Sequence, residues 1–238
     1  METESAAGTR QRGGRGARER ILQAAAKLFY EEGIHATGIA RLVETAEVST
    51  RTFYQHFPTK NALVGEYLRN YKAALSRRIE QHLSREGLSP PDQLLSLFSL
   101  LAEATWGPSG RKTNRGCPFH NAAVEGAGHM PDVQELVLHH KNGLTQQLAD
   151  IATRAGAANP DQLGRQLNVL LEGAHALGTS LDNPCPRHDA LEAARVLIEH
   201  ALPEDTTRQL TPAHRRRVLP DQPDSVSTGD VHFPAPGS

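Results

Sequence analysis

The chain has 238 residues and nearly balanced charge, with 26 Lys and Arg against 27 Asp and Glu and a formal net charge of −1. This balance excludes a protein that coats nucleic acid or membranes over its whole surface, so any basic patch must be local. Two cysteines, Cys117 and Cys185, are too few for a disulfide framework or a complete cysteine zinc site. No apolar run is long enough to cross a membrane, and the polar first residues lack the apolar core of a signal peptide. We therefore expect a cytoplasmic protein with no membrane partner.

Leu and Ala recur at helical spacing along most of the chain, whereas alternating β-branched residues are scarce. This pattern predicts an all-α fold of about nine helices, divided by Gly and Pro clusters. We expect a disordered basic arm at residues 1–16, a helix-turn-helix domain at 17–63, a larger helical domain at 64–202 and a disordered, Pro-rich tail at 203–238.

The predicted helix-turn-helix begins with a helix from residue 17 to about residue 32, which ends at the C-cap signal of Gly33. A short second helix follows. Thr37 is placed to cap it and to offer a hydroxyl group to a phosphate. After a turn of a few residues, Ser49 caps a third helix. Two short helices joined by a tight turn have the shape that fits the major groove of B-DNA.

The third predicted helix has two different faces. Phe53 and Phe57 lie four residues apart, which predicts a buried aromatic face. The remaining side chains are polar and of the types that contact bases and phosphates, namely Thr50, Arg51, Thr52, Tyr54 and Gln55. The alternative is that Arg51 is merely solvated and that Tyr54 belongs to the core.

A long fourth helix is predicted over residues 60–83, because Pro58 ends the third helix and Thr59 can cap the fourth. Lys60 then lies at a helix N-terminus, where a cation opposes the helix dipole unless an anion lies beside it. A DNA phosphate would be such an anion. The arginines within residues 10–20 add positive charge that either reaches the DNA or simply solubilises the arm.

Residues 33–39, 46–49 and 53–63 together resemble the DNA-binding domain of the tetracycline-repressor (TetR) family. The resemblance extends over about residues 17–63. It implies a homodimeric all-α repressor that binds a palindromic operator through its recognition helix, and that is released when a small-molecule effector binds a second domain. The larger helical domain, 64–202, would then bind the ligand and form the dimer.

The resemblance also implies roles for single residues. Tyr54 and Lys60 would hold phosphates, the first residues of the third helix would face bases, and His56 matches a position of the family pattern. Glu47 stands where the family usually has Gly, which predicts a local adjustment of the turn. The predicted DNA-binding residues are Thr37, Ser49, Thr50, Arg51, Thr52, Tyr54, Gln55, His56 and Lys60.

Five further helices are expected, over about residues 90–106, 119–126, 131–151, 160–181 and 189–201. Residues 115–125, which lead into and include most of the second of these helices, resemble a segment that lies beside the pocket in one branch of these regulators. A pocket for an unidentified small molecule is predicted from a mixture of apolar and polar side chains, namely Phe98, Trp106, Cys117, Phe119, His120, Asn121 and Met130. The alternative for each is an ordinary core position, which for Cys117 means a packed thiol rather than a redox switch.

The last two predicted helices, within about 160–179 and 189–201, resemble the pair that forms a four-helix dimer bundle in this family. An intrachain core is the alternative. A ligand in the second domain would change the separation of the two recognition helices through the long fourth helix and so weaken DNA binding.

Two other classes of function compete with this interpretation. Twelve histidines suggest a metal site or an all-α enzyme, and Glu135 and His139 form an i, i+4 pair. However, no third ligand is fixed by spacing, and no nucleophile-base pair or cofactor loop is visible, so we expect no metal, no cofactor and no enzyme activity. A protein-interaction module is the second rival, and it would lack salt-dependent DNA binding.

Overall fold

The computed structural model describes residues 16–84, 87–103, 115–181 and 185–207. All secondary structure in these residues is helical, which confirms the predicted all-α fold. The helices are α1 (Ala17–Glu31), α2 (Ile39–Thr45), α3 (Thr50–His56), α4 (Lys60–Leu83), α5 (Pro90–Glu103), α6 (Pro118–Glu125), α7 (Pro131–Arg154), α8 (Pro160–Ser180), α9 (Cys185–Ala201) and α10 (Glu204–Thr207).

The C-terminal region differs in two respects from the prediction. The helix α9 begins at Cys185, before the expected residue 189. The short helix α10 lies in the segment that was predicted as a disordered tail. Acidic residues in its first turn favour the helix dipole, and the N–H of Thr206 donates to the carbonyl of Pro203 at 3.0 Å. The predicted arm except Gly16, the tail beyond residue 207 and Trp106 lie outside the described residues.

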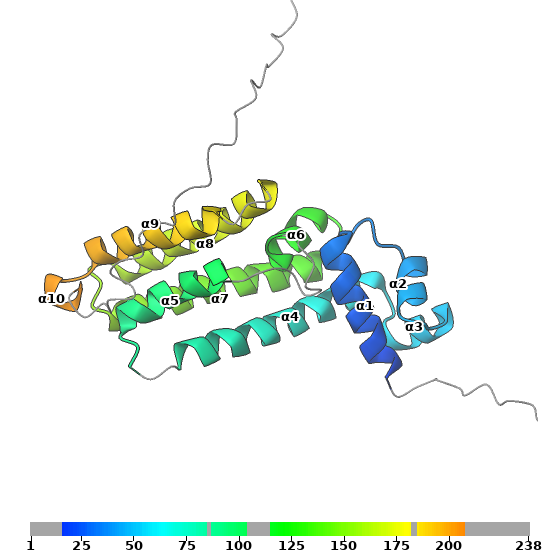
Figure 1. Ribbon diagram of the computed structural model, residues 1–238. Helices are drawn as coiled ribbons and strands as arrows, with labels where there is room; N and C mark the ends of the chain where they lie inside the picture. The colour runs from blue at the N-terminus through cyan, green and yellow to red at the C-terminus, as the bar shows by residue number, and fades with distance from the viewer. Residues whose placement is uncertain (1–15, 85–86, 104–114, 182–184, 208–238) are drawn as a thin grey trace, which may run out of the picture.

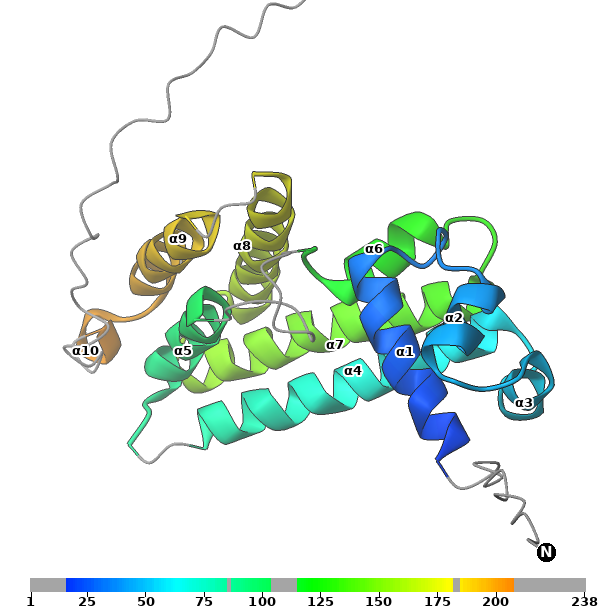
Figure 2. The same ribbon diagram turned by 45° about the vertical axis from the view of Figure 1, so that its right-hand side comes forward.

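The helices form an elongated arrangement. Figure 1 shows α1, α2 and α3 grouped at one end, with α5, α8 and α9 toward the other end. The two longest helices, α4 and α7, run lengthwise between them, and Figure 2 shows α6 beside α1 and α7. The helix α4 therefore reaches from one group of helices to the other.

Two hydrophobic clusters form the core. The first joins α1, α2 and α3 to α6 and to the first turns of α4 and α7, and it includes Phe53, Phe119 and Val133. The second joins α5, α8 and α9 to the C-terminal half of α7. Because the first cluster continues from α3 into α6 and α7, the three N-terminal helices share buried surface with the larger helical domain.

The helices α7 and α8 are in close contact. A Cβ atom added at Gly164 would lie 2.9 Å from the backbone nitrogen of Ala149 and 3.0 Å from the carbonyl oxygen of Thr145. Backbone atoms cannot rotate away as the end of a long side chain can. The two helix axes can therefore approach here only because residue 164 is glycine.

We predict that Gly164→Ala lowers the free energy of unfolding by about 1–3 kcal/mol, because the added methyl group overpacks the α7–α8 contact. The matched control is Gly143→Ala, where an added Cβ meets no atom within 4 Å. That change should raise the free energy of unfolding by up to about 1 kcal/mol through helix propensity. Chemical denaturation measures both, and a Gly164→Ala protein as stable as Gly143→Ala would contradict the packing account.

Candidate functional site

The third helix presents one aromatic and one polar face, as predicted. Phe53 has no exposed surface, and Phe57 is also buried. The rings of these two residues lie 6.1 Å apart, whereas Tyr54 points outward and is 50% exposed. With the phenyl rings held inside, the polar side chains of α3 are left at the end of the molecule, where Figure 1 places the helix.

Side-chain hydroxyl groups cap the N-termini of α3 and α4. The Ser49 hydroxyl oxygen accepts from the N–H of Thr52 at 3.0 Å and shares a 2.8 Å hydrogen bond with the Thr52 hydroxyl. The Thr59 hydroxyl oxygen accepts from the N–H of Ala62 at 3.0 Å. Both predicted N-caps are confirmed. They fix where each helix starts, and so fix Lys60 in the first turn of α4.

The turn between α2 and α3 is compact although Glu47 stands where the resemblance leads us to expect glycine. Glu47 has a φ of 51°, and among the described residues it is the only non-glycine residue with a positive φ. The N–H of Glu47 donates to the Glu44 carbonyl at 3.1 Å, and the N–H of Val48 donates to the Val43 carbonyl at 3.0 Å. Glu47 thus adopts the conformation that favours glycine, at a cost of about 1–2 kcal/mol.

The prediction that Thr37 caps α2 and contacts a phosphate is wrong. Gly38 is the N-cap residue of α2 and makes no side-chain cap. Thr37 has no exposed surface, and its hydroxyl donates to the Gly33 carbonyl at 2.6 Å. A hydroxyl group can donate to a backbone carbonyl or accept from a backbone N–H. Here the Thr37 hydroxyl donates to a carbonyl in the loop after α1.

The other predicted DNA-binding residues lie together on α3, at its N-cap and at the start of α4. Five of them are exposed: Ser49, Thr50, Arg51, Tyr54 and Gln55. Thr52, His56 and Lys60 are half-buried. The Lys60 ammonium donates to the His35 carbonyl at 3.4 Å, and burial lowers the pKa of Lys60 while the Glu125 carboxylate opposes that shift. The result is a polar surface that carries cations on two adjacent helices.

A contact that was not predicted connects this region to the segment at α6. The Arg115 side chain donates to the Glu31 carbonyl at 2.8 Å, and its backbone N–H donates to the Tyr30 hydroxyl at 3.2 Å. At the other end of α6, the Glu125 carboxylate accepts from the N–H of His35 at 2.6 Å. The end of α1 and the loop after it are therefore each held by a residue far along the chain. No local sequence pattern signals such contacts.

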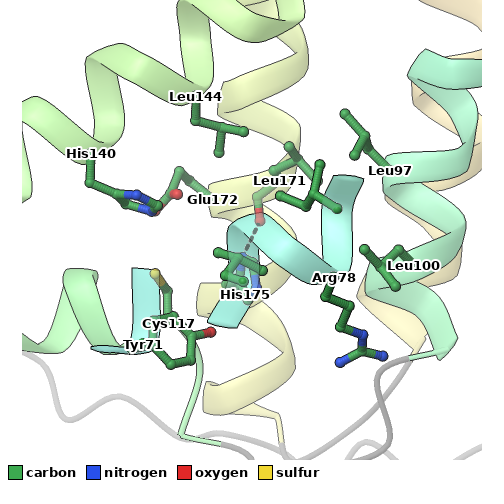
Figure 3. A pocket seen from close by; sticks show the side chains of 12 residues that line it. Tyr71, Arg78, Leu97, Leu100, Cys117, His140, Leu144, Leu171, Glu172 and His175 are labelled. Atoms are coloured by element: carbon green, nitrogen blue, oxygen red, sulfur yellow. Dashed lines mark hydrogen bonds between the residues drawn. The ribbon is translucent and has the colours of Figure 1, made fainter. Parts of the chain in front are cut away.

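A cavity of about 140 Å³ lies between α4, α5, α7, α8 and the residue that precedes α6. Its lining is Tyr71, Leu75, Arg78, Ile79, Leu97, Leu100, Cys117, His140, Leu144, Leu171, Glu172 and His175. Figure 3 shows Tyr71, Cys117 and His140 on one side, and Leu97 and Leu100 on the other. The cavity therefore has one polar side and one mainly apolar side, at which Arg78 lies beside Leu100.

Of the six predicted pocket residues that the structure describes, Cys117 alone lines this cavity, and the seventh, Trp106, lies outside the described residues. Phe98 is fully buried in the second hydrophobic cluster, and Phe119 and Met130 are buried in the first. His120 is exposed, while the Asn121 amide donates to the Arg115 carbonyl at 2.7 Å. The cavity wall instead comes from stripes of α4, α7 and α8 that the sequence showed only as helix faces.

Comparison with known proteins identifies the fold and its N-terminal helices. Residues 21–67 match the family model described as bacterial regulatory proteins, tetR family. A TetR-family transcriptional regulator from Streptomyces coelicolor is 26% identical and has a TM-score of 0.71, over 78% of this chain and 95% of that one. These matches support a DNA-binding transcriptional regulator of the TetR family, which is a class of non-enzymatic proteins.

Curated relatives match less than half of this chain. The transcriptional repressor DhaR from a Mycobacterium species is 27% identical over 108 residues, which are 45% of this chain and 51% of that protein. The transcriptional repressor KstR2 from Mycolicibacterium smegmatis is 33% identical over 87 residues, 37% of this chain and 42% of that protein. The chain spans about half the length or less of these relatives.

Among the described residues, no three His, Cys, Asp or Glu side chains lie close enough together to hold a metal ion. Within the same part of the chain, no helix is both long and apolar enough to cross a membrane.

Two histidines line the cavity in an environment that disfavours their charged form. Burial, helped by the ammonium groups of Lys141 and Lys72, lowers the pKa of His140 to about 4. The His140 ring stacks on Phe119, with the ring centres 3.8 Å apart. Burial also lowers the pKa of His175, whose Nδ1 lies 2.9 Å from the Leu171 carbonyl. Both imidazoles are therefore neutral near pH 7.

We predict that acidification destabilises the protein partly through His140. Unfolded His140 takes up a proton near pH 6.5 and folded His140 near pH 4, so stability is lost as the pH falls through this window. His140→Leu should reduce the loss of unfolding free energy between pH 7 and pH 5 by about 2 kcal/mol. His139→Leu, an exposed neighbour on the same helix, is the control. Equal pH dependence in the two variants, measured by urea denaturation at fixed protein concentration, would contradict this account.

Proposed function

We propose that this TetR-family chain is a ligand-released repressor that binds a palindromic operator as a homodimer. The observation that carries the proposal is the geometry of α3, with Phe53 buried and the polar side chains of Thr50, Arg51 and Tyr54 directed to solvent. A short helix with this division of faces, joined to α2 by a tight turn, fits the major groove of B-DNA.

Within this surface we assign base contacts to α3 and phosphate contacts to its borders. The exposed guanidinium of Arg51 can donate two hydrogen bonds to a guanine, and Thr50 lies beside it at the start of the helix. Tyr54, one turn further along α3, and Lys60, at the start of α4, would contact phosphates. Gln55 and His56 lie near enough in sequence to add contacts at the same border. Such contacts make affinity fall with salt concentration.

The proposed dimer uses α8 and α9. Four large apolar side chains on these helices are more than half exposed in the single chain, namely Val169, Leu177, Leu181 and Val196. Figure 1 shows the two helices side by side at the outside of the molecule. Because exposed apolar side chains at helical spacing favour association, a second copy packed here would form a four-helix interface.

The proposed ligand response runs from the cavity to the loop after α1. Tyr71 of α4 and Cys117, directly before α6, both line the cavity. The same segment carries Arg115 and Glu125, which bind the backbone at Glu31 and His35. A ligand that displaces Tyr71 or Cys117 would therefore shift α4 and α6 together. This would change the separation of the two recognition helices in the dimer.

We predict that Lys60→Ala and Tyr54→Phe weaken binding to every DNA duplex, Lys60→Ala by roughly tenfold, because each removes a phosphate contact. Arg51→Ala should instead change preference at particular base pairs. Fluorescence anisotropy with labelled duplexes measures both effects. The matched control is Arg77→Ala, which removes an exposed cation from α4 outside the proposed surface.

For Lys60→Ala, the slope of log affinity against log salt concentration should also fall by about one. The assignment of phosphate contacts is wrong if Lys60→Ala and Arg77→Ala bind DNA equally well at every salt concentration. An unchanged base preference in Arg51→Ala would remove that residue from base recognition.

We predict that Val169→Asp converts the dimer to a monomer at micromolar concentration, because the change places a charge in an apolar interface. Val124→Asp changes a similarly exposed valine on α6 and should leave the dimer intact; the two side chains are 70% and 64% exposed. Analytical ultracentrifugation gives the mass of each variant. A dimeric Val169→Asp protein would place the interface elsewhere.

A further inference from the structure

The cavity contains polar groups that the protein itself does not satisfy. Among the described residues, the Tyr71 hydroxyl and the ring nitrogens of His140 have no hydrogen-bond partner, although both side chains line the cavity. His175 contributes a third such group. A carbonyl can only accept, so the Nδ1 of His175, drawn with its dashed contact to Leu171 in Figure 3, carries the proton and donates. Its Nε2 is left as an unpaired acceptor.

The interior of the cavity is nearly neutral. Both histidines are uncharged near pH 7, because burial lowers the pKa of each. The Glu172 carboxylate is paired with the Lys141 ammonium, so its charge is compensated. Arg78 is exposed and its charge remains in contact with water. A cationic ligand would therefore lose its hydration without gaining an unpaired counter-charge inside, and an anionic ligand would meet only Arg78, whose charge is screened by water.

The size and the remaining wall restrict the ligand further. The cavity of about 140 Å³ is similar to an engineered cavity of about 150 Å³ in another protein that binds benzene. Six aliphatic side chains supply the apolar part of the wall, namely Leu75, Ile79, Leu97, Leu100, Leu144 and Leu171. A single six-membered ring fits both the volume and the wall.

We propose that the effector is an uncharged single-ring molecule with one hydroxyl group. The ring packs against the leucines of α5 and α7, and the hydroxyl donates to Nε2 of His175 while its oxygen accepts from Tyr71. This inference rests on the proposed function for its regulatory meaning, but ligand binding itself can be measured without DNA. The ligand inference and the proposed function can therefore be tested separately.

The test titrates the full chain with three probes by isothermal titration calorimetry. Phenol has the ring and the hydroxyl, toluene has the ring without the hydroxyl, and benzoate adds a charge. We expect phenol to bind in a 1:1 ratio to each chain, toluene to bind roughly tenfold more weakly because a hydrogen bond is lost, and benzoate more weakly than toluene. Equal or tighter binding of benzoate or toluene overturns the proposal, as does the absence of phenol binding.

Variants locate the site. Tyr71→Phe should weaken phenol roughly tenfold and leave toluene unchanged, because only the hydroxyl partner is removed. Tyr67→Phe is the matched control, since that tyrosine lies one turn earlier on α4 and does not line the cavity. His175→Phe should likewise abolish the preference for phenol over toluene. Unchanged phenol affinity in a folded Tyr71→Phe protein, as judged by circular dichroism, overturns the assignment.

Operator binding, measured on the same samples, separates this inference from the proposed function. A chain that binds DNA but not phenol refutes the ligand class alone. A chain that binds phenol but no DNA refutes the repressor and leaves the ligand class supported.

Discussion

The orientation of α3 depends on the burial of two phenyl rings. The helices α2 and α3 have seven residues each, which is too short for an isolated helix to be stable in water. Tertiary packing must therefore hold them. Phe53 and Phe57 supply that packing from one face of α3, and the Arg18 guanidinium lies 5.5 Å from the centre of the Phe57 ring. Since the rings must face inward, the polar side chains between them must face the solvent.

The same buried cluster extends beyond the helix-turn-helix. It includes Phe119 of α6, Val133 of α7 and Cys117, which also lines the cavity, so the N-terminal helices and the wall of the cavity share one packed cluster. Packed interiors transmit displacement because they have little free volume. The polar contacts of Arg115 and Glu125 act at the edge of this cluster. This arrangement gives a physical route by which ligand binding in the cavity could alter DNA binding at the other end of the molecule.

The starts of several helices could be predicted from the sequence, because they depend on residues close together in the chain. Pro131 and Pro160 begin helices because proline suits the first turn, and Ser49 and Thr59 cap theirs by bonding to an N–H three residues ahead. Thr37 shows the limit of such signals, because its hydroxyl had two possible backbone partners and packing decided between them. The cavity shows the same limit at longer range. Tyr71, His140 and His175 each belong to an ordinary helix stripe, and only the packing of three helices turns them toward one space.

The most direct test of the account is selection of bound duplexes from random DNA by the full chain. Because a two-fold dimer presents two copies of α3, the account predicts an enriched sequence made of two inverted half-sites, with centres about 10 base pairs apart or at a multiple of that spacing. Recovery of unenriched DNA even in low salt would contradict the assignment of α3 as a recognition helix.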